Sequence, residues 1–272
     1  ACMYVSSGGT ASRTTAAYAK IFAYQGASIS GTELNSWGVL SAMGEVRQTT
    51  VNSSGLMHVL NGGTASGTTV NAYGSMYVSS GGSAVGILLN SNGFLDIRNA
   101  NVNSLTVSRG GSCAIAGGTV NHLTLMSRGS AVVSNTEING VEVFSSGRLD
   151  CVSYLEGKMA VSGAIVHSDG QITMSSGALI SATTVSKAGT LNLENGGSSY
   201  QTHIYEEGKF TMLGVANHTV LNGGSMYIGD SAYRYYDGTG GVPTSNVYDE
   251  DIHASVNILN SSWMHVYSGG TA

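Results

Sequence analysis

The chain has 272 residues, of which 39 are Gly and only one is Pro, and its charged residues amount to 10%. A net charge of −5 with only 11 Lys and Arg excludes the basic surface that nucleic-acid binding requires, and no apolar run approaches the ~18 residues of a membrane-spanning helix. Three Cys without a Cys-x-x-Cys pair exclude a standard zinc site, and the sequence predicts no cofactor.

The first strand-like segments show the repeat on which the fold depends. Hydrophobic residues make up 42% of the chain, enough for a core, and Gly, Ser, Thr and Asn between β-branched residues are typical of short strands and tight turns. Segment 49–59 (TTVNSSGLMHV) and segment 68–78 (TTVNAYGSMYV) align without a gap at a period of 19 residues. Such a period indicates stacked supersecondary units.

One turn position per repeat can be followed along the whole chain. Most spacings between these positions are 16 to 19 residues, and eleven of the fourteen are Gly. The series is Ala1, Lys20, Gly38, Gly55, Gly74, Gly93, Gly111, Gly129, Gly147, Gly170, Gly189, Gly208, Gly224 and Ser262.

Apolar residues form columns at fixed offsets from these turns. The residues two and four places after each turn are always apolar, as in Met57 and Val59 or Phe22 and Tyr24, and the residue between them is often polar. This alternation predicts a strand with one buried face. A third apolar column lies four places before the turn and contains Val51, Val70, Leu89, Val107, Leu125, Val143, Val166, Val185, Ile204, Val220 and Ile258.

The expected fold is therefore all-β: a β-solenoid of about fourteen short rungs in a single domain over residues 1–272. Each rung would consist of a strand, a Gly turn, a second strand and a second turn. The second turn is marked by paired glycines such as Gly62-Gly63 and Gly81-Gly82. Asn52, Asn71 and Asn90 share a column, where stacked amides can hydrogen-bond. A right-handed β-helix is favoured over a left-handed hexapeptide helix, whose apolar positions would recur every six residues.

The interval between Gly224 and Ser262 is 38 residues, about twice the usual period, which predicts an inserted loop or a degenerate rung at 229–261. Within it, exposed Tyr, Arg and Asp side chains would stack on and hydrogen-bond a sugar or a protein; an ornamental loop is the alternative interpretation. The candidate binding residues are Tyr233, Arg234, Tyr235, Tyr236, Asp237, Tyr248 and Asp249. A calcium site at Asp249, Glu250 and Asp251 would need converging oxygens that one run does not guarantee, so no metal site is predicted.

No catalytic constellation is apparent, and we expect no enzyme. Asp96 and Asp150 share a column but lie three rungs apart, roughly 14 Å at ~4.8 Å per rung, whereas paired glycosidase carboxylates lie ~5–9.5 Å apart. His58 and His265 fall in the outward column, where a solvated His is ordinary. Cys113 and Cys151 fall in inward columns two rungs apart, too far for a disulfide, and are expected to be free and buried.

The run Gly-Gly-Thr-Ala at 8–11 and 62–65, with Val-Ser-Ser or Val-Leu-Asn before it and Thr-Thr-Val-Asn after it, resembles the AIDA-type repeat of bacterial autotransporter passengers. The resemblance covers essentially the whole chain. It implies an extended β-helix on the bacterial outer-membrane surface or outside the cell, and in some members Ser or Thr is heptosylated. Because both ends stop inside a rung, we interpret the sequence as a fragment whose open strand edges favour self-association.

Two classes of function follow from these observations. The first is an extracellular structural or adhesive passenger segment that mediates self-association or adhesion to host or neighbouring cells, with a host-surface protein or glycan as partner. The second is a carbohydrate-binding or carbohydrate-active β-helix with its site in the loop at 229–252. Binding without turnover would favour the first class, and turnover would favour the second.

Overall fold

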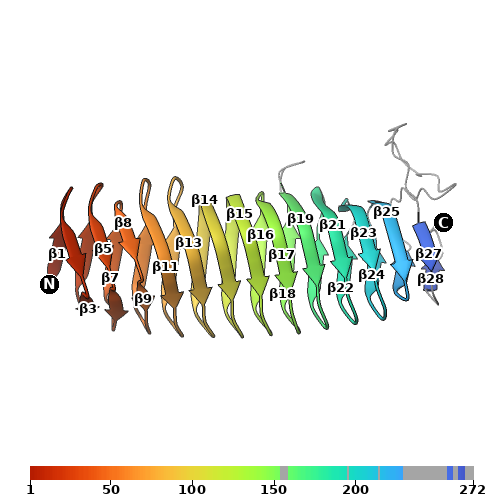
Figure 1. The fold of residues 1–272 in the computed structure, drawn as a ribbon, viewed down its shortest axis with the longest axis horizontal. Coiled ribbons are helices and arrows are strands. Elements are labelled where there is room, and N and C mark those ends of the chain that lie inside the picture. Colours follow the sequence, from red (N-terminus) through yellow and green to blue (C-terminus); the bar gives the residue numbers. More distant parts are fainter. Residues whose placement is uncertain (154–158, 195, 214, 229–255, 260–262, 267–272) are drawn as a thin grey trace. The chain divides into compact units, whose positions relative to one another are not determined.

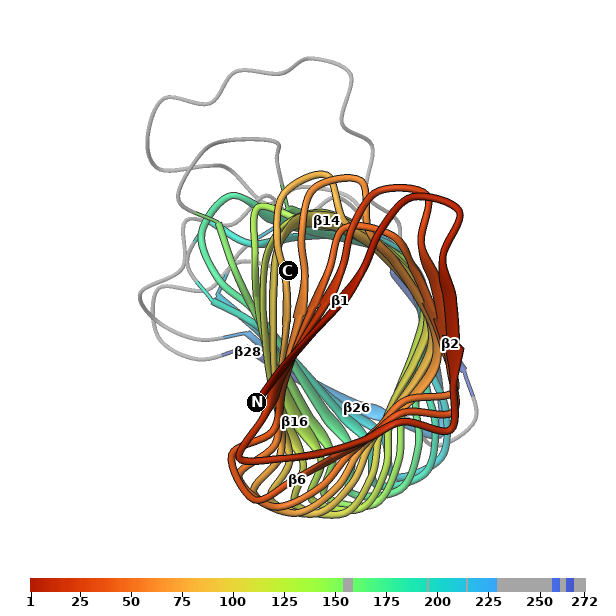
Figure 2. The same cartoon turned by 90° about the vertical axis from the view of Figure 1, so that its left-hand side faces the viewer.

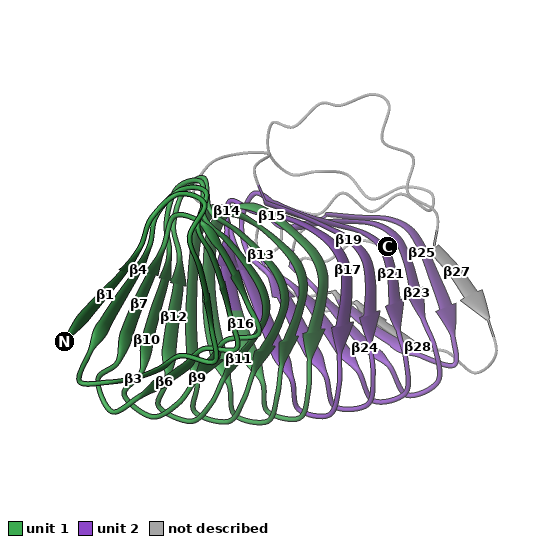
Figure 3. Ribbon diagram, turned by 60° about the vertical axis from the view of Figure 1, so that its left-hand side comes forward, with its two compact units in different colours: residues 1–131 green, residues 132–272 purple. Residues whose placement is uncertain are grey.

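The computed structural model describes residues 1–153, 159–194, 196–213, 215–228, 256–259 and 263–266, and the regular secondary structure of these residues consists of β-strands alone (Figure 1). The chain divides into two compact units, unit 1 at Ala1–Ala131 and unit 2 at Val132–Ala272 (Figure 3). Each unit is described by itself below.

Unit 1 contains fifteen complete strands in its described residues. They are β1 (Cys2–Val5), β2 (Thr10–Ser12), β3 (Thr15–Ala17), β4 (Lys20–Ala23), β5 (Ser28–Ser30), β6 (Glu33–Asn35), β7 (Val39–Ala42), β8 (Glu45–Arg47), β9 (Thr50–Val51), β10 (Leu56–Val59), β11 (Thr64–Val70), β12 (Ser75–Val78), β13 (Ser83–Leu89), β14 (Phe94–Val107) and β15 (Ser112–Leu125).

The boundary between the units falls within β16 (Ser130–Ser134). The described strands of unit 2 are β17 (Glu137–Val143), β18 (Arg148–Val152), β19 (Met159–Val166), β20 (Gln171–Met174), β21 (Ala178–Val185), β22 (Thr190–Leu193), β23 (Ser198–Ile204), β24 (Lys209–Met212), β25 (Val215–Asn222), β26 (Ser225–Ile228), β27 (Val256–Leu259) and β28 (Trp263–Val266).

Every strand pairs in parallel with its counterpart in the next rung, which confirms the predicted β-solenoid. In unit 1, β10 pairs with β7 and β12, and Met57 is level with Leu40 and Met76. In unit 2, β22 pairs with β20 and β24 in the same manner. Viewed from the amino-terminal end, the first turns of unit 1 run clockwise as they recede, so the coil is right-handed (Figure 2).

The predicted repeat agrees with the strand boundaries. A strand begins at, or directly after, each of the fourteen predicted turn positions. Strands β26, β27 and β28 continue the same parallel pairing. From Leu40 to Met226, every member of the two predicted apolar columns is buried.

Two positions in the predicted register are wrong by one residue. In the second rung, Ile21 and Ala23 are buried and pair with Met3 and Val5, so the predicted inward residues Phe22 and Tyr24 point outward. In the third column, Leu221 rather than Val220 is buried and is level with Ile204 and Ile258. In both places the neighbouring residue is also apolar, so alternation alone could not choose between the two phases.

Each rung has three strand segments rather than the two that were predicted. The second predicted strand bends at a residue with positive φ, such as Gly67 (φ 63°), Gln48 (φ 51°) or His218 (φ 54°). In the first three rungs the bend separates two strands, as between β2 and β3, whereas from β11 onward one strand continues through it. The residue after the bend points inward, and Thr32, Thr49 and Thr68 are completely or almost completely buried there.

The corner at Gly62-Gly63 shows why the paired glycines recur. Gly62 has φ +79°, a conformation that L side chains rarely adopt. A Cβ on Gly63 would lie 2.2 Å from the carbonyl oxygen of Ala42 in the preceding rung. The first Gly therefore turns the chain, and the second allows the rungs to approach closely.

The cysteines have the predicted state. Cys113 and Cys151 are free and buried, and Cys2 is free and exposed. Burial raises the pKa of the Cys113 thiol to about 12, and burial together with the nearby Asp150 carboxylate raises the pKa of Cys151 as well. Both buried thiols are thus neutral, small apolar groups of the core at physiological pH.

Part of the predicted insertion at 229–261 lies in the described structure. Strand β27 pairs in register with β25, and Asn257 is level with Val220. Residues 229–255 and 260–261 lie outside the described residues, so the insertion itself stays a prediction.

Candidate binding surface

The predicted binding residues of the insertion are not among those that the structure describes. Tyr233, Arg234, Tyr235, Tyr236, Asp237, Tyr248 and Asp249 all fall in the segment 229–255. A recognition site in that segment stays a prediction, and the described surface is considered next.

The two outward acids that the sequence singled out are each paired with an Arg on the same strand. In unit 1, the Arg98 guanidinium donates to the Asp96 carboxylate, with its nearest nitrogen 2.9 Å from Oδ2. In unit 2, Arg148 Nε donates to Asp150 Oδ2 at 2.6 Å. Within the described residues, no group of three or more His, Cys, Asp or Glu side chains could hold a metal ion.

The corner that precedes each turn position carries large exposed aromatic side chains in unit 1. Tyr18, Trp37 and Tyr73, here called the aromatic corner, are 75%, 68% and 69% exposed. All three have positive φ, at 50°, 66° and 61°, which costs a bulky residue about 1–2 kcal/mol. Backbone hydrogen bonds link this corner from rung to rung; Trp37 N, for example, donates to Ser54 O at 3.1 Å.

The strained backbone of the aromatic corner indicates that these side chains serve a purpose other than folding. The other rungs of unit 1 have Ser54, Asn92, Gly110 and Arg128 at the equivalent position, also with positive φ; among these, Asn and Gly adopt that conformation at low cost. Bulky aromatics that are both strained and exposed contribute little to folding. Exposed aromatic clusters are typical of surfaces that bind a partner.

A second group of rings lies on the outward face of the first strands. Tyr4 stacks on Phe22 with ring centroids 5.2 Å apart and an interplanar angle of 9°, and Tyr24 lies 6.4 Å from Tyr4. Parallel pairing sets Tyr4 level with Phe22, so the stack follows from the register of β1 and β4. Unit 1 thus displays aromatic side chains on a face and along a corner.

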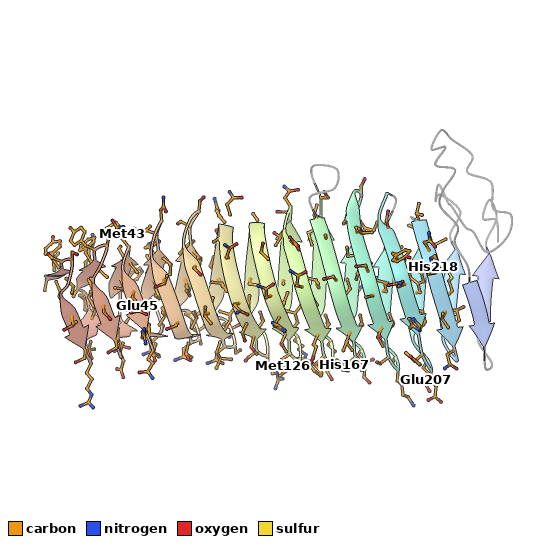
Figure 4. The ribbon with its side chains drawn as sticks, turned by 45° about the horizontal axis from the view of Figure 1, so that its top comes forward. Met43, Glu45, Met126, His167, Glu207 and His218 are labelled. Carbon is orange, nitrogen blue, oxygen red and sulfur yellow. The ribbon has the colours of Figure 1, made fainter. Side chains whose placement is uncertain are left out.

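The surface of unit 2 has a different character. An open groove of about 530 Å³ lies where β21, β23 and β25 bend, and its lining includes Thr184, Gln201, His203 and His218. The ring of His218 meets Tyr200 edge-on at 5.0 Å. Figure 4 shows His218 away from the edge along which His167 and Glu207 lie. The groove offers hydrogen-bonding groups but no carboxylate among its described lining.

One signal in the sequence could have identified the aromatic corner: Trp37 and Tyr73 each directly precede a turn glycine. In the structure, the residue before such a glycine has positive φ throughout the described corners of this column. The sequence analysis examined the interior columns and the insertion, and left this corner column out. No helix in the described structure is long and apolar enough to span a membrane.

Comparisons with known proteins place the fold but show no family. No protein-family model matches the sequence, and no curated protein matches it. Among solved structures, the chain is similar to the hyper-glycosylated TibA55-350 fragment, whose glycosylation was catalysed by TibC. The two share 27% sequence identity with a TM-score of 0.62, and the alignment covers 86% of this chain and 93% of that one.

Proposed function

We propose that this chain is an extracellular adhesive segment, displayed on the bacterial surface, whose outward side chains mediate self-association or attachment to host or neighbouring cells. The exposed, strained aromatic corner of unit 1 carries this proposal. Tyr and Trp supply large contact areas at low cost in side-chain entropy and are enriched where proteins bind partners.

Two further observations support it. The parallel solenoid repeats its outward positions from rung to rung, so a partner can meet many side chains at once although each contact is weak. The fold resembles the TibA fragment, and the repeat resembles that of autotransporter passengers. In this proposal, binding rather than turnover is the activity.

The test replaces the aromatic corner without altering the backbone. In a triple variant, Tyr18→Asn, Trp37→Asn and Tyr73→Asn, each new side chain matches the residue already present at Asn92 with φ 56°. Beads coated with the chain are assayed for aggregation and for retention on cultured host cells. We expect the triple variant to fold as well as the unaltered chain and to lose at least ~10-fold in retention or aggregation, equivalent to one hot-spot contact or more.

The control is Arg128→Asn, a non-aromatic substitution at the same corner of unit 1 with φ 58°. It should leave both assays unchanged. If the triple variant aggregates and adheres like the unaltered chain, the aromatic corner is not the adhesive surface. Coated beads are also mixed with uncoated beads. Aggregates that contain coated beads alone indicate self-association, whereas aggregates that include uncoated beads indicate attachment to another surface.

A further inference from the structure

An open groove of about 320 Å³ lies on the outward side of unit 1. Its lining is His58, Tyr77, Val78, Ser79, Asp96 and Arg98, which come from β10, β12 and β14 and the turn after β12. Its volume is at the lower end of the ~300–1,000 Å³ typical of small-molecule sites, which suits one or two sugar-sized units.

The register of three neighbouring strands builds one wall of the groove from rings. His58, Tyr77 and Asp96 are level with one another across β10, β12 and β14. The imidazole of His58 stacks on Tyr77 with centroids 5.3 Å apart and an angle of 24°. Phe94 approaches Tyr77 at 5.9 Å, tilted by 59°. The next two residues of the column, Asp96 and Ala114, carry no ring, so the aromatic stack ends at Tyr77.

The opposite part of the groove is polar and held in place. Asp96 is 8% exposed, a burial that carboxylates tolerate only when they are paired. Arg98 Nε lies 3.1 Å from Asp96 Oδ2 and 3.2 Å from Oδ1, whereas the Arg98 side chain is 73% exposed. The guanidinium therefore keeps donors free for a ligand, and the hydrogen bond and charge of Asp96 raise the pKa of Arg98.

The groove has no net charge at neutral pH. Asp96 and Arg98 neutralise each other, and burial lowers the pKa of His58, so its ring is neutral and offers one donor and one acceptor. The other hydrogen-bonding groups of the lining are the Tyr77 and Ser79 hydroxyls. Ring faces beside a set of donors and acceptors without net charge match a ligand with an apolar C–H face and several hydroxyls.

We propose that this groove binds a neutral pyranose unit of a glycan. The C–H face of the sugar would pack against Tyr77, and adjacent hydroxyls would donate to the Asp96 carboxylate and accept from Arg98. The inference deepens the proposed adhesive function, because it names a ligand class for one part of the outward surface and rests on that function for its role at the cell surface.

Charged ligands fit the groove less well. The Asp96 carboxylate would repel an anionic sugar, and the Arg98 guanidinium would repel a cationic ligand, so neither ligand meets the unpaired opposite charge that would favour it. Hydrolysis of a glycosidic bond uses two carboxyl groups, and the described lining has one, already paired. The chemistry of the groove is that of recognition.

The test measures binding of neutral glycans by the full chain in solution. An immobilised panel of neutral glycans identifies the sugar, and calorimetry with its methyl glycoside gives the affinity. We expect Tyr77→Ala to weaken the affinity at least ~10-fold. Asp96→Asn, which keeps the shape but removes the charge that holds Arg98, should also weaken it by about tenfold or more.

Two matched variants serve as controls. Tyr4→Ala removes a stacked ring from the same outward column without an Asp–Arg pair beside it. Asp150→Asn removes an outward carboxylate that is also paired with an Arg, but that lies in unit 2. Both should bind the glycan with unchanged affinity. Circular dichroism and melting of all four variants show whether the fold is retained.

The outcomes separate this inference from the proposed function. The inference is wrong if no neutral glycan binds at millimolar concentration or if only anionic glycans bind. It is also wrong if Tyr77→Ala and Asp96→Asn bind the glycan as well as the controls do. In each of these cases, bead adhesion by the aromatic corner would be unaffected. If the glycan binds as expected while the beads neither aggregate nor adhere, the proposed adhesive function is wrong, and the assignment of the groove as a glycan site is retained. A tyrosine-bearing peptide that displaces the glycan at lower concentration would overturn the ligand class.

Discussion

One corner column, three residues before the turn position, is filled in opposite ways in the two units. Over four rungs of unit 1 it is a chain of amides: Asn52, Asn71 and Asn90 each donate from Nδ2 to Oδ1 of the preceding Asn, at 2.7, 2.7 and 2.8 Å, and the series starts at Asn35. In unit 2 the column contains rings, and Phe144 stacks on His167 at 4.1 Å with an angle of 7°.

The backbone of this corner is the same in both units, so the comparison isolates what the side chains contribute. Gly55 N donates to Asn52 O at 2.8 Å, and Gly170 N donates to His167 O at 2.9 Å. Parallel rungs place like positions ~4.8 Å apart, a spacing that suits both an amide hydrogen bond and a stacked ring pair. The solenoid therefore requires only that neighbours in a column be compatible with each other, and its outer chemistry is free to vary.

The largest expected effect comes from breaking the close approach that both units share. A Cβ at Gly63 of unit 1 would lie 2.2 Å from Ala42 O, and one at Gly197 of unit 2 would lie 2.7 Å from Met174 O. We expect Gly63→Ala to lower the free energy of unfolding by about 3 kcal/mol and Gly197→Ala by about 2 kcal/mol, because a backbone oxygen cannot move aside. Denaturant titration measures both.

Gly62→Ala is the control for this pair. Only Met43 O lies within 4 Å of its Cβ, at 3.9 Å, so the remaining penalty is that of φ +79°, about 1–2 kcal/mol. If Gly62→Ala is as destabilising as Gly63→Ala, conformational strain rather than rung spacing determines the need for glycine at this corner.

The next effect distinguishes the two versions of the corner column. Asn52→Ala removes two hydrogen bonds and leaves Asn35 Oδ1 and Asn71 Nδ2 without their partner, so we expect a loss of about 2 kcal/mol in unfolding free energy. His167→Ala removes a stacked ring beside Phe144, which has no polar group to orphan, and we expect a loss of about 1 kcal/mol. Equal losses at the two sites, measured by the same titration, would contradict the distinction.

The amide ladder was predictable from sequence, and the ring stack shows where prediction stopped. Asn52, Asn71 and Asn90 are chemically identical at a period of 19, so the sequence alone indicated their contact, and Asn35 was missed only because its spacing is 17. Phe144 and His167 differ in type and lie 23 residues apart, outside the usual period, so the sequence did not indicate their contact. By contrast, the level positions of His58, Tyr77 and Asp96 followed from the sequence, because all three occupy the outward column between the two interior columns.

A smaller effect, of opposite sign, comes from buried threonines that both units share. Thr68 in unit 1 and Thr202 in unit 2 are 1% and 0% exposed, and their Oγ1 atoms have no hydrogen-bond partner. Replacing a buried, unpaired hydroxyl by a methyl group of the same shape removes a desolvation penalty. We expect Thr68→Val and Thr202→Val each to raise the unfolding free energy by about 1 kcal/mol. Destabilisation by either variant would show that the hydroxyl is satisfied in solution.

The smallest effect is expected for the surface ion pairs, which also differ between the units. In unit 1, Glu45 pairs with Arg47 on one strand; in unit 2, Lys187 pairs with Glu207 of the next rung, with 3.3 Å between Nζ and Oε1. All four side chains are between 43% and 61% exposed, so solvent screens both pairs. We expect Arg47→Gln and Lys187→Gln each to change the unfolding free energy by at most about 0.5 kcal/mol.

A double-mutant cycle of Lys187→Gln with Glu207→Gln, repeated at low and high salt, tests this last expectation. The coupling between the two charges should be within about 0.5 kcal/mol at low salt and vanish at high salt, because ions screen exposed charges within a few ångströms at ~1 M. A coupling that persists at high salt would mean that the rung-to-rung pair holds unit 2 together. With a weak coupling, the outward charges contribute little to folding, and substitutions there can alter partner binding without unfolding the solenoid.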